Sequence, residues 1–373
     1  MTTKPIGLYV HIPFCVRKCN YCDFCSFDIS SVTWKEQYLK ALESEIRSYT
    51  ERNIAVDSIF IGGGTPSLLT PDEFGLITEA IKDSFDVLPD VEFTVEANPG
   101  TLNEEKLAAF VRCGVNRLSM GLQSIHENEL KTLGRIHNFD DFKHSFTIAR
   151  KIGINNINVD LMYGIPHQTI DSFSKTLESV CDLLPEHISL YGLIIEEGTP
   201  FYKMQRELPL PTEDTECDMY YFAAKYLRKL GYFHYEISNY AKAGMECQHN
   251  LKYWRCEEYI GVGLNAHSYL DSKRFYNSEN ADEYILDIGR KNEAEDELDN
   301  DDKAYEYVML RLRLSEGFSL SEYRSLFGRD FLKDHMDTVK RLCNSDLVDL
   351  SCDRLSLTEK GLYVSNSIIN ELL

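Results

Sequence analysis

Short apolar segments alternate with amphipathic helical segments from residue 6 to about residue 230. Six of them have the length and residue types of buried strands: Ile6–Ile12, Asp57–Ile61, Glu92–Glu96, Arg117–Gly121, Asn156–Met162 and His187–Ile194. Helices are expected between them, one beginning at the capping box Thr70–Glu73 and others at Glu104–Cys113, Phe139–Ile152, Ile170–Leu184 and Glu213–Leu230. Strands joined by helices in series form a parallel sheet, so we predict an α/β fold, either doubly wound or a barrel.

Polar residues stand at the ends of four of these strands. The sequence GGGTP follows the second strand, Glu96 ends the third, Gln123 ends the fourth and Asp160 lies late in the fifth. A carboxylate or amide is costly in a buried strand unless it has a use, and barrel enzymes carry their sites at the carboxyl ends of their strands. Each residue alone could cap the next helix, but four in succession favour a barrel with a site at this edge.

Four of the eleven cysteines lie close together in CVRKCNYCDFC. The chain shows no signal-peptide pattern and no apolar run long enough to span a membrane, so we expect a cytoplasmic protein with reduced thiols. Cys15, Cys19 and Cys22 have three and then two residues between them. This spacing suits an iron–sulfur cluster with one iron left open. The alternative is a structural zinc site that also includes Cys25, and the barrel and the glycine loop make it less favoured.

The net charge bears on the expected partners, and the composition along the chain predicts the domains. A formal net charge of −21 repels phosphate backbones, so nucleic acid is not an expected partner. The predicted domains are a barrel over 1–235, an extension rich in Tyr, His and Asn over 236–290, an acidic linker over 291–302 (KNEAEDELDNDD) and a C-terminal domain over 303–373. In the last, helices, a hairpin of LVDL and RLSL and a final helix from Thr358 follow the order of a winged helix.

Taken together, these motifs resemble the radical S-adenosylmethionine superfamily, through the C-x3-C-x2-C spacing, GGGTP and the serial β-α pattern. Within it, the chain is similar to the HemW family of heme chaperones, which is related to oxygen-independent coproporphyrinogen III oxidases. The motifs that carry this similarity are YVHIPFC, DFCSF, IFIGGGTPSLL, VEANPG, RLSMGLQS, LGRIH, NVDLMYGIP and HNLKYW. The resemblance covers nearly the whole chain and implies a partial (β/α)6 TIM-like barrel with a C-terminal winged-helix-like domain.

The resemblance also implies two cofactors and the residues that hold them. A [4Fe-4S] cluster would be bound by Cys15, Cys19 and Cys22, and its open iron would chelate S-adenosylmethionine. An electron from the cluster can then split the sulfonium into methionine and a 5′-deoxyadenosyl radical. By motif, the S-adenosylmethionine site would comprise Tyr9, Tyr21, Gly63, Gly64, Thr65, Glu96, Gln123, Arg135 and Asp160. Arginine can pair a carboxylate, and carboxylates accept bonds from ribose hydroxyls.

HNLKYW matches the HNxxYW signature of the heme chaperones. A neutral imidazole is a good axial ligand for heme iron, and aromatic rings can pack on a porphyrin face. His249, Tyr253 and Trp254 are therefore the predicted heme site. The common alternative for a lone histidine is a core residue whose hydrogen bonds are satisfied. His267, His234, Cys247 and Cys256 remain as other candidate ligands.

The resemblance implies a heme chaperone that takes heme from a donor and transfers it to apo-hemoproteins such as respiratory enzymes. The alternative is an oxygen-independent coproporphyrinogen III dehydrogenase, which decarboxylates two propionates. That enzyme has a longer segment before its cysteines and a fourth cysteine at the position where Phe24 stands here. Many relatives carry asparagine in place of Cys25, and we expect that Cys25 is not a ligand, because a fourth thiolate would close the open iron. The family also raises the expectation of a homodimer and of peripheral membrane association.

Overall fold

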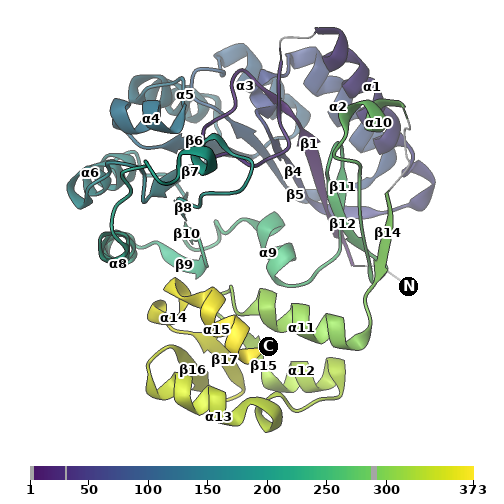
Figure 1. Ribbon diagram of the computed structural model, residues 1–373. Coiled ribbons are helices and arrows are strands. Elements are labelled where there is room, and N and C mark those ends of the chain that lie inside the picture. Colours follow the sequence, from purple (N-terminus) through teal and green to yellow (C-terminus); the bar gives the residue numbers. More distant parts are fainter. Residues whose placement is uncertain (1–3, 30–31, 287–291) are drawn as a thin grey trace.

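The computed structural model describes residues 4–29, 32–286 and 292–373, and its centre is a curved, open sheet (Figure 1). Six parallel strands lie side by side in sequence order: β1 (Ile6–Ile12), β4 (Ala55–Gly63), β5 (Asp86–Ala97), β6 (Arg117–Gln123), β7 (Asn156–Tyr163) and β8 (His187–Gly192). The six predicted strands and the partial barrel are confirmed. β5 begins before the predicted start at Glu92, because its first residues pair with β4. Several of these residues are exposed, so the apolar pattern of the sequence does not reveal them.

The connecting helices cover the outer side of the sheet (Figure 1). They are α1 (Val32–Arg47), α2 (Pro71–Ser84), α3 (Glu104–Cys113), α4 (Glu127–Leu133), α5 (Phe139–Ile152), α6 (Ile170–Cys181) and α8 (Glu213–Lys229). The short helix α7 (Pro200–Met204) lies instead against the cysteine loop. The predicted capping box is present at α2, where Thr70 Oγ1 accepts a bond from the Glu73 amide at 3.2 Å. Among the described residues, no helix is both long and apolar enough to cross a membrane.

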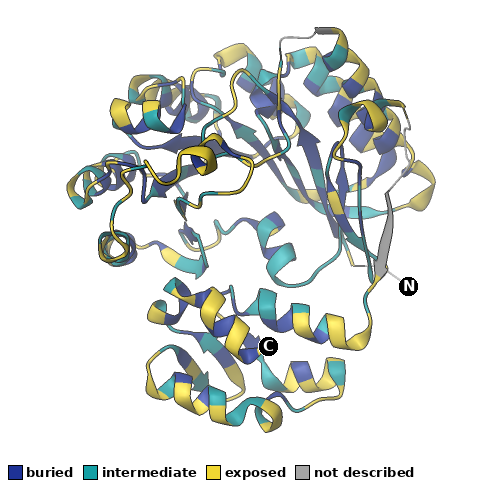
Figure 2. Ribbon diagram, viewed as in Figure 1, coloured by how far each residue is buried: buried dark blue, intermediate teal, exposed yellow. Residues whose placement is uncertain are grey.

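Alternate residues of each strand face opposite sides, and this separates the core from the barrel interior. In β6, Leu118, Met120 and Leu122 belong to the apolar core beneath the helices, whereas Arg117 and Ser119 line the interior. Buried strand residues form the dark centre of Figure 2. The outer face of the sheet therefore packs in the apolar core, whereas its inner face carries polar side chains that are available for ligand binding.

Further strands extend the sheet at both edges. β11 (Tyr259–Val262) pairs in parallel with β1, and β12 (His267–Leu270), β13 (Lys273–Tyr276) and β14 (Asn292–Glu297) continue from it antiparallel. At the other edge β10 (Asn239–Ala241) and β9 (Phe233–Glu236) follow β8. Two short strands, β2 (Phe14–Cys15) and β3 (Phe27–Asp28), pair beside the barrel.

The segment that we expected to be an acidic linker, 291–302, is structured over much of its length. Lys291 lies outside the described residues, but β14 begins at Asn292 and pairs with β13, and α11 begins at Asn300 behind the cap Asp299. The prediction was wrong here because an edge strand gains its stability from backbone bonds to its neighbour, which acidic side chains do not prevent.

The C-terminal residues form a separate small core below the barrel (Figure 1). Its elements are α11 (Asn300–Arg311), β15 (Phe318–Ser319), α12 (Leu320–Phe327), α13 (Phe331–Asn344), β16 (Val348–Ser351), β17 (Arg354–Leu357), α14 (Glu359–Tyr363) and α15 (Ser365–Leu372). The hairpin predicted from LVDL and RLSL is present as β16 and β17. Helix α9 (Gln248–Trp254) lies between this domain and the barrel, and α10 (Ala281–Leu286) packs against α1.

A buried carboxylate on α1 ties the extension of the sheet to the barrel. Glu45 is 3% exposed and accepts bonds from the Gly263 amide at 2.8 Å, Asn277 Nδ2 at 2.7 Å and the Tyr284 hydroxyl at 2.6 Å. We expect Glu45→Ala to lower the free energy of unfolding by about 3 kcal/mol or more, because it leaves buried hydrogen-bond donors without an acceptor. Urea unfolding followed by circular dichroism measures this loss.

The matched control is Glu43→Ala on the same helix. Glu43 forms a more exposed pair with Arg47 at 3.0 Å, and such pairs contribute about 0.5 kcal/mol or less. Equal losses in the two variants would contradict the role given to Glu45.

Candidate functional site

A cavity of about 590 Å³ lies inside the curved sheet. It extends from Arg117 and His187, at the amino ends of β6 and β8, to Gly63 and Gly192, at the carboxyl ends of β4 and β8. Six of the nine residues predicted for S-adenosylmethionine line it, together with Cys22: Tyr9, Tyr21, Gly63, Glu96, Gln123 and Asp160. The structure therefore brings together residues that are up to 151 positions apart in the chain.

Thr65 and Arg135 lie with Cys19 around a small neighbouring cavity. Gly64 packs against the cysteine loop, since a Cβ at this position would stand 2.7 Å from the Phe14 carbonyl oxygen. Gly63 has a φ of 111°, a conformation that favours glycine. The glycine loop thus lets the backbone approach the cysteine loop closely.

The first three cysteines of the cluster motif are neighbours around the mouth of the barrel. Cys15 Sγ lies 3.7 Å from Thr65 Oγ1, and Cys19 Sγ lies 3.7 Å from an Arg135 nitrogen. Burial raises the pKa of the Cys22 thiol to about 11, and the nearby Cys19 and Cys15 add to this shift. A bound metal or cluster offsets such a shift by stabilising the thiolate.

Cys25 is oriented differently. Its thiol lies 3.9 Å from the Glu279 carbonyl oxygen, and its own carbonyl accepts a bond from His11 Nε2 at 2.8 Å. Burial raises its pKa too, but the charges that act on it are Lys18 and Glu279 rather than the other thiols. Across residues 4–29, 32–286 and 292–373, no three cysteine, histidine or acidic side chains converge as ligands of a single metal ion.

The cysteine loop is anchored by backbone contacts on both sides. The Asn20 amide donates to the Leu133 carbonyl at 2.9 Å, and the Phe201 amide donates to the Asn20 carbonyl at 3.0 Å. Asn20 Nδ2 also donates to the Thr132 carbonyl at 2.9 Å. Helices α4 and α7 therefore hold the loop over the carboxyl ends of the strands.

Arg135 has the features of an anion-binding group. Its Nη2 donates to Asn98 Oδ1 at 2.7 Å and to the Gly121 carbonyl, while its buried Nε finds no hydrogen-bond acceptor in the described part of the chain. Buried donors are normally paired. The residues present therefore fit a cluster beside Cys19 together with the carboxylate of an amino acid.

Two carboxyl groups, those of Glu96 and Asp160, line the cavity. Glu96 accepts a bond from the Gly63 amide at 3.0 Å, and Asp160 accepts one from Asn158 Nδ2 at 2.8 Å. Burial, with a further contribution from Asp160, raises the pKa of Glu96 to about 8. Burial also raises the pKa of Asp160. Near neutral pH Glu96 is thus mostly protonated and can donate as well as accept a hydrogen bond.

Our sequence reasoning missed a polar network on the inner face of the sheet. His187 bonds to Asn158 Oδ1 at 2.6 Å and to the Tyr235 hydroxyl at 2.8 Å, and Asn158 Nδ2 donates to Ser119 Oγ at 2.8 Å. Arg117, 2% exposed, lines the same cavity. The signal was present in the alternation of polar residues along RLSMGLQ, NINVD and HIS, a period-2 pattern that marks a polar face.

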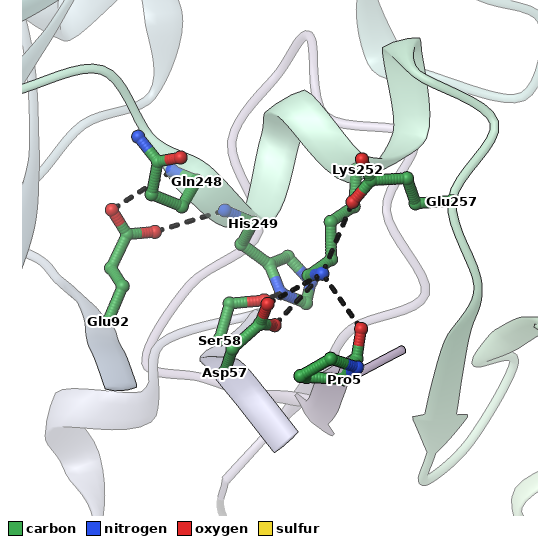
Figure 3. Close-up of polar contacts among 8 residues, drawn as sticks. All are labelled: Pro5, Asp57, Ser58, Glu92, Gln248, His249, Lys252 and Glu257. Atoms are coloured by element: carbon green, nitrogen blue, oxygen red, sulfur yellow. Dashed lines mark hydrogen bonds and ion pairs between the residues drawn. The ribbon is translucent and has the colours of Figure 1, made fainter. Parts of the chain in front are cut away.

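His249 lies on α9 with both ring nitrogens occupied, and Figure 3 shows its contact with Ser58. Nδ1 lies 3.1 Å from Ser58 Oγ, and Nε2 lies 2.8 Å from the Tyr253 hydroxyl. Burial lowers the pKa of His249 to about 3. The ring lines the large cavity, but the imidazole cannot ligate heme iron without breaking one of these bonds.

Residues in and beside the HNxxYW motif anchor α9 to β4 and β5 (Figure 3). Glu92 accepts bonds from the amides of Gln248 at 3.0 Å and His249 at 3.1 Å, a carboxylate at a helix N-terminus. Lys252 Nζ donates to Asp57 Oδ2 at 3.1 Å and also contacts Pro5 and Glu257. These contacts fasten α9 to β4 and β5.

The remaining heme candidates differ in position. Tyr253 lines the large cavity, whereas Trp254 packs on the Arg313 guanidinium at 5.7 Å and does not line it. His234 stacks on Tyr240 with ring centroids 4.1 Å apart. Three others lie elsewhere: Cys247 near Glu92, Cys256 in a cavity facing the C-terminal domain, and His267 on β12.

Glu236, near Trp254, makes stability depend on pH. The side chain is 0% exposed, and burial raises its pKa from 4.5 to about 7. The native state therefore keeps a proton that the unfolded chain has released, so the free energy of unfolding falls as the pH rises through this window. Glu236→Gln removes this loss because glutamine does not titrate. Between the low-pH and the high-pH end of this range, we expect the free energy of unfolding of the variant to rise by about 3 kcal/mol relative to that of the wild type.

Urea unfolding at several pH values from acid to mildly alkaline checks this expectation. The exposed Glu105→Gln change serves as the control and should track the wild type. A difference between Glu236→Gln and the wild type that stays constant with pH would contradict it.

Comparison with known proteins agrees with this geometry. The family model for the radical SAM superfamily matches residues 9–180, and that for the HemN C-terminal domain matches residues 298–364. The structure of coproporphyrinogen III oxidase (HemN) from Escherichia coli, a radical SAM enzyme, superposes with a TM-score of 0.86 at 23% identity, over 99% of this chain and 90% of that chain. The fold and its cysteine loop are therefore those of a radical SAM protein.

Sequence relatives define the family more closely. The chain is 36% identical to the heme chaperone HemW of Bacillus subtilis (strain 168), over 98% of each chain. It is 34% identical to the heme chaperone HemW of Escherichia coli (strain K12), over 99% of this chain and 98% of that protein. The chain belongs to the HemW family of heme chaperones.

Proposed function

We propose that this chain binds heme inside the barrel and transfers it to apo-hemoproteins, with a [4Fe-4S] cluster and S-adenosylmethionine bound beside the heme. The observation that carries the proposal is the lining of one cavity by two kinds of residue. Glu96, Gln123 and Asp160 provide polar contacts, and Phe60 and Tyr253 provide aromatic surface. A site of this size, with aromatic surface as well as polar groups in its lining, suits a planar macrocycle next to a polar cofactor.

The cofactor side of the cavity has a defined division of roles. Cys15, Cys19 and Cys22 would hold the cluster, which when bound supplies an electron and an open iron for the amino acid end of S-adenosylmethionine. Arg135 would pair the carboxylate of that ligand through its free Nε. Asp160 and the mostly protonated Glu96 would bind the ribose hydroxyls. Cys25, directed toward Glu279, would take no part.

The function requires reduced thiols and therefore suits the cytoplasm. Its donor of heme and its acceptors would be other proteins, and the acceptors would be apo-hemoproteins such as respiratory enzymes. Homodimer formation and peripheral membrane association belong to the same proposal. Sedimentation and vesicle flotation, with and without heme, test them.

The proposal is tested by anaerobic reconstitution with iron and sulfide, followed by titration with heme. We expect a saturable Soret band at about one heme per chain, and loss of that band to an added apo-hemoprotein. The same reconstituted protein, given coproporphyrinogen III, S-adenosylmethionine and a reductant, should yield no decarboxylated porphyrin. Absence of heme uptake, or turnover of coproporphyrinogen, would contradict the proposal.

A further inference from the structure

A second cavity, of about 430 Å³, adjoins the large one. Four lining residues belong to both cavities: Tyr9, Asp23, Phe24 and Tyr253. The second cavity is further lined by Tyr259 of β11, by His267 of β12 and by Cys25. Aromatic side chains from the cysteine loop, from α9 and from the sheet thus surround one space beside the cofactor residues.

Four histidines line the two cavities, and three of them have no nitrogen free. His11 bonds to the Tyr9 hydroxyl at 2.9 Å and to the Cys25 carbonyl at 2.8 Å. His187 and His249 each bond to two side chains, as described above. A ligand to iron needs a free nitrogen lone pair, so iron binding by any of the three requires a bond to break.

His267 is the exception. Its side chain is exposed, and no hydrogen bond to either ring nitrogen is found among the residues that the structure describes. The ring instead stacks on Tyr276, the residue directly opposite on β13, with centroids 5.1 Å apart and planes 22° apart. Stacking fixes the ring orientation and leaves the nitrogens available.

The backbone around His267 is also fixed in place. The turn that precedes β12 is closed by the Ala266 amide, which donates to the Gly263 carbonyl at 3.2 Å. The Asn265 amide donates to the Ser278 carbonyl at 3.0 Å. A Cβ at Gly261 would stand 2.2 Å from the His267 carbonyl oxygen, so this strand pair packs closely. The imidazole is therefore presented from a rigid strand rather than from a mobile loop.

We propose that His267 is the protein's axial ligand to heme iron, with the macrocycle lying where the two cavities adjoin, among Phe24, Tyr253 and Tyr259. The inference rests on the proposed heme-binding function and places the ligand outside the HNxxYW motif. Ligation requires the neutral imidazole with a free nitrogen lone pair. The bound heme would then contact Phe24 and Cys25, which belong to the loop that carries the cluster cysteines.

The test is heme titration of the reconstituted full-length protein and of two histidine variants. We expect His267→Ala to shift the Soret band and to weaken heme binding at least about tenfold, as removal of a metal ligand does. Added imidazole should restore the band of this variant. His335→Ala is the matched control, because His335 also stacks on an aromatic ring, Phe331, but lies in the C-terminal domain away from both cavities. It should behave as the wild type.

The outcomes separate the inference from the function. Heme uptake by the wild type with an unchanged Soret band and affinity in folded His267→Ala would overturn the ligand assignment alone. A shifted band in His249→Ala but not in His267→Ala would overturn it as well. Absence of heme uptake by the wild type would overturn the proposed function, and the ligand assignment with it.

Discussion

Cys19→Ser is expected to remove the iron–sulfur cluster almost completely, whereas Cys25→Ser is expected to retain it. Cys19 lies between Cys15 and Cys22 and its thiol lies 3.7 Å from the Arg135 guanidinium. A cluster held by three thiolates has no spare protein ligand, so loss of one leaves an unstable assembly. Cys25 is near in sequence, but its thiol faces the Glu279 carbonyl.

Iron and sulfide analysis after anaerobic reconstitution measures the effect. We expect about four iron atoms per chain in the wild type and in Cys25→Ser, and close to none in Cys19→Ser. Circular dichroism of both variants shows whether the fold is intact. Loss of iron in Cys25→Ser, or zinc bound through four thiolates in the wild type, would contradict the three-cysteine site.

Asp160→Asn is expected to weaken S-adenosylmethionine binding by about 10- to 100-fold, the range of one hydrogen bond to a charged group. Asp160 lines the cavity and lies near the buried Arg117 and Arg135, whose charges lower its pKa against the effect of burial. Asparagine keeps the shape and loses the charge. Calorimetric titration under anaerobic conditions gives the affinity, and iron analysis shows that the cluster is retained.

Asp57→Asn is the matched control for this change. It makes the same substitution at the opposite end of the barrel, where Asp57 pairs with Lys252 at 2.9 Å beneath α9. We expect unchanged affinity there. Equal affinities in wild type and Asp160→Asn would mean that Asp160 does not contact the cofactor.

Much of the barrel could be predicted from the sequence because local patterns determine it. The apolar alternation of β1 and β6 and the capping box at Thr70 act over a few residues. The cysteine spacing and GGGTP are local signals too. Their placement at one edge of the sheet followed from the rule that parallel strands put their carboxyl ends together.

What could not be predicted depends on contacts between distant residues. Ser58 bonds to a histidine 191 positions away, and no local pattern shows that this bond occupies the ring. The parallel pairing of β11 with β1 is likewise set by long-range packing. The period of a strand tells which side chains share a face, not which partners they meet. For this reason the contacts that fasten α9 to the sheet through Glu92 and Asp57 could not be predicted from HNxxYW.

The most direct test of the cluster with an open iron is electron paramagnetic resonance of the reduced, oxygen-protected protein before and after S-adenosylmethionine is added. We predict a [4Fe-4S]⁺ signal whose g values change on addition, because the amino acid end of the ligand occupies the fourth iron. A signal that stays the same at saturating ligand, or a reduced protein with no such signal, would contradict the site built from Cys15, Cys19 and Cys22.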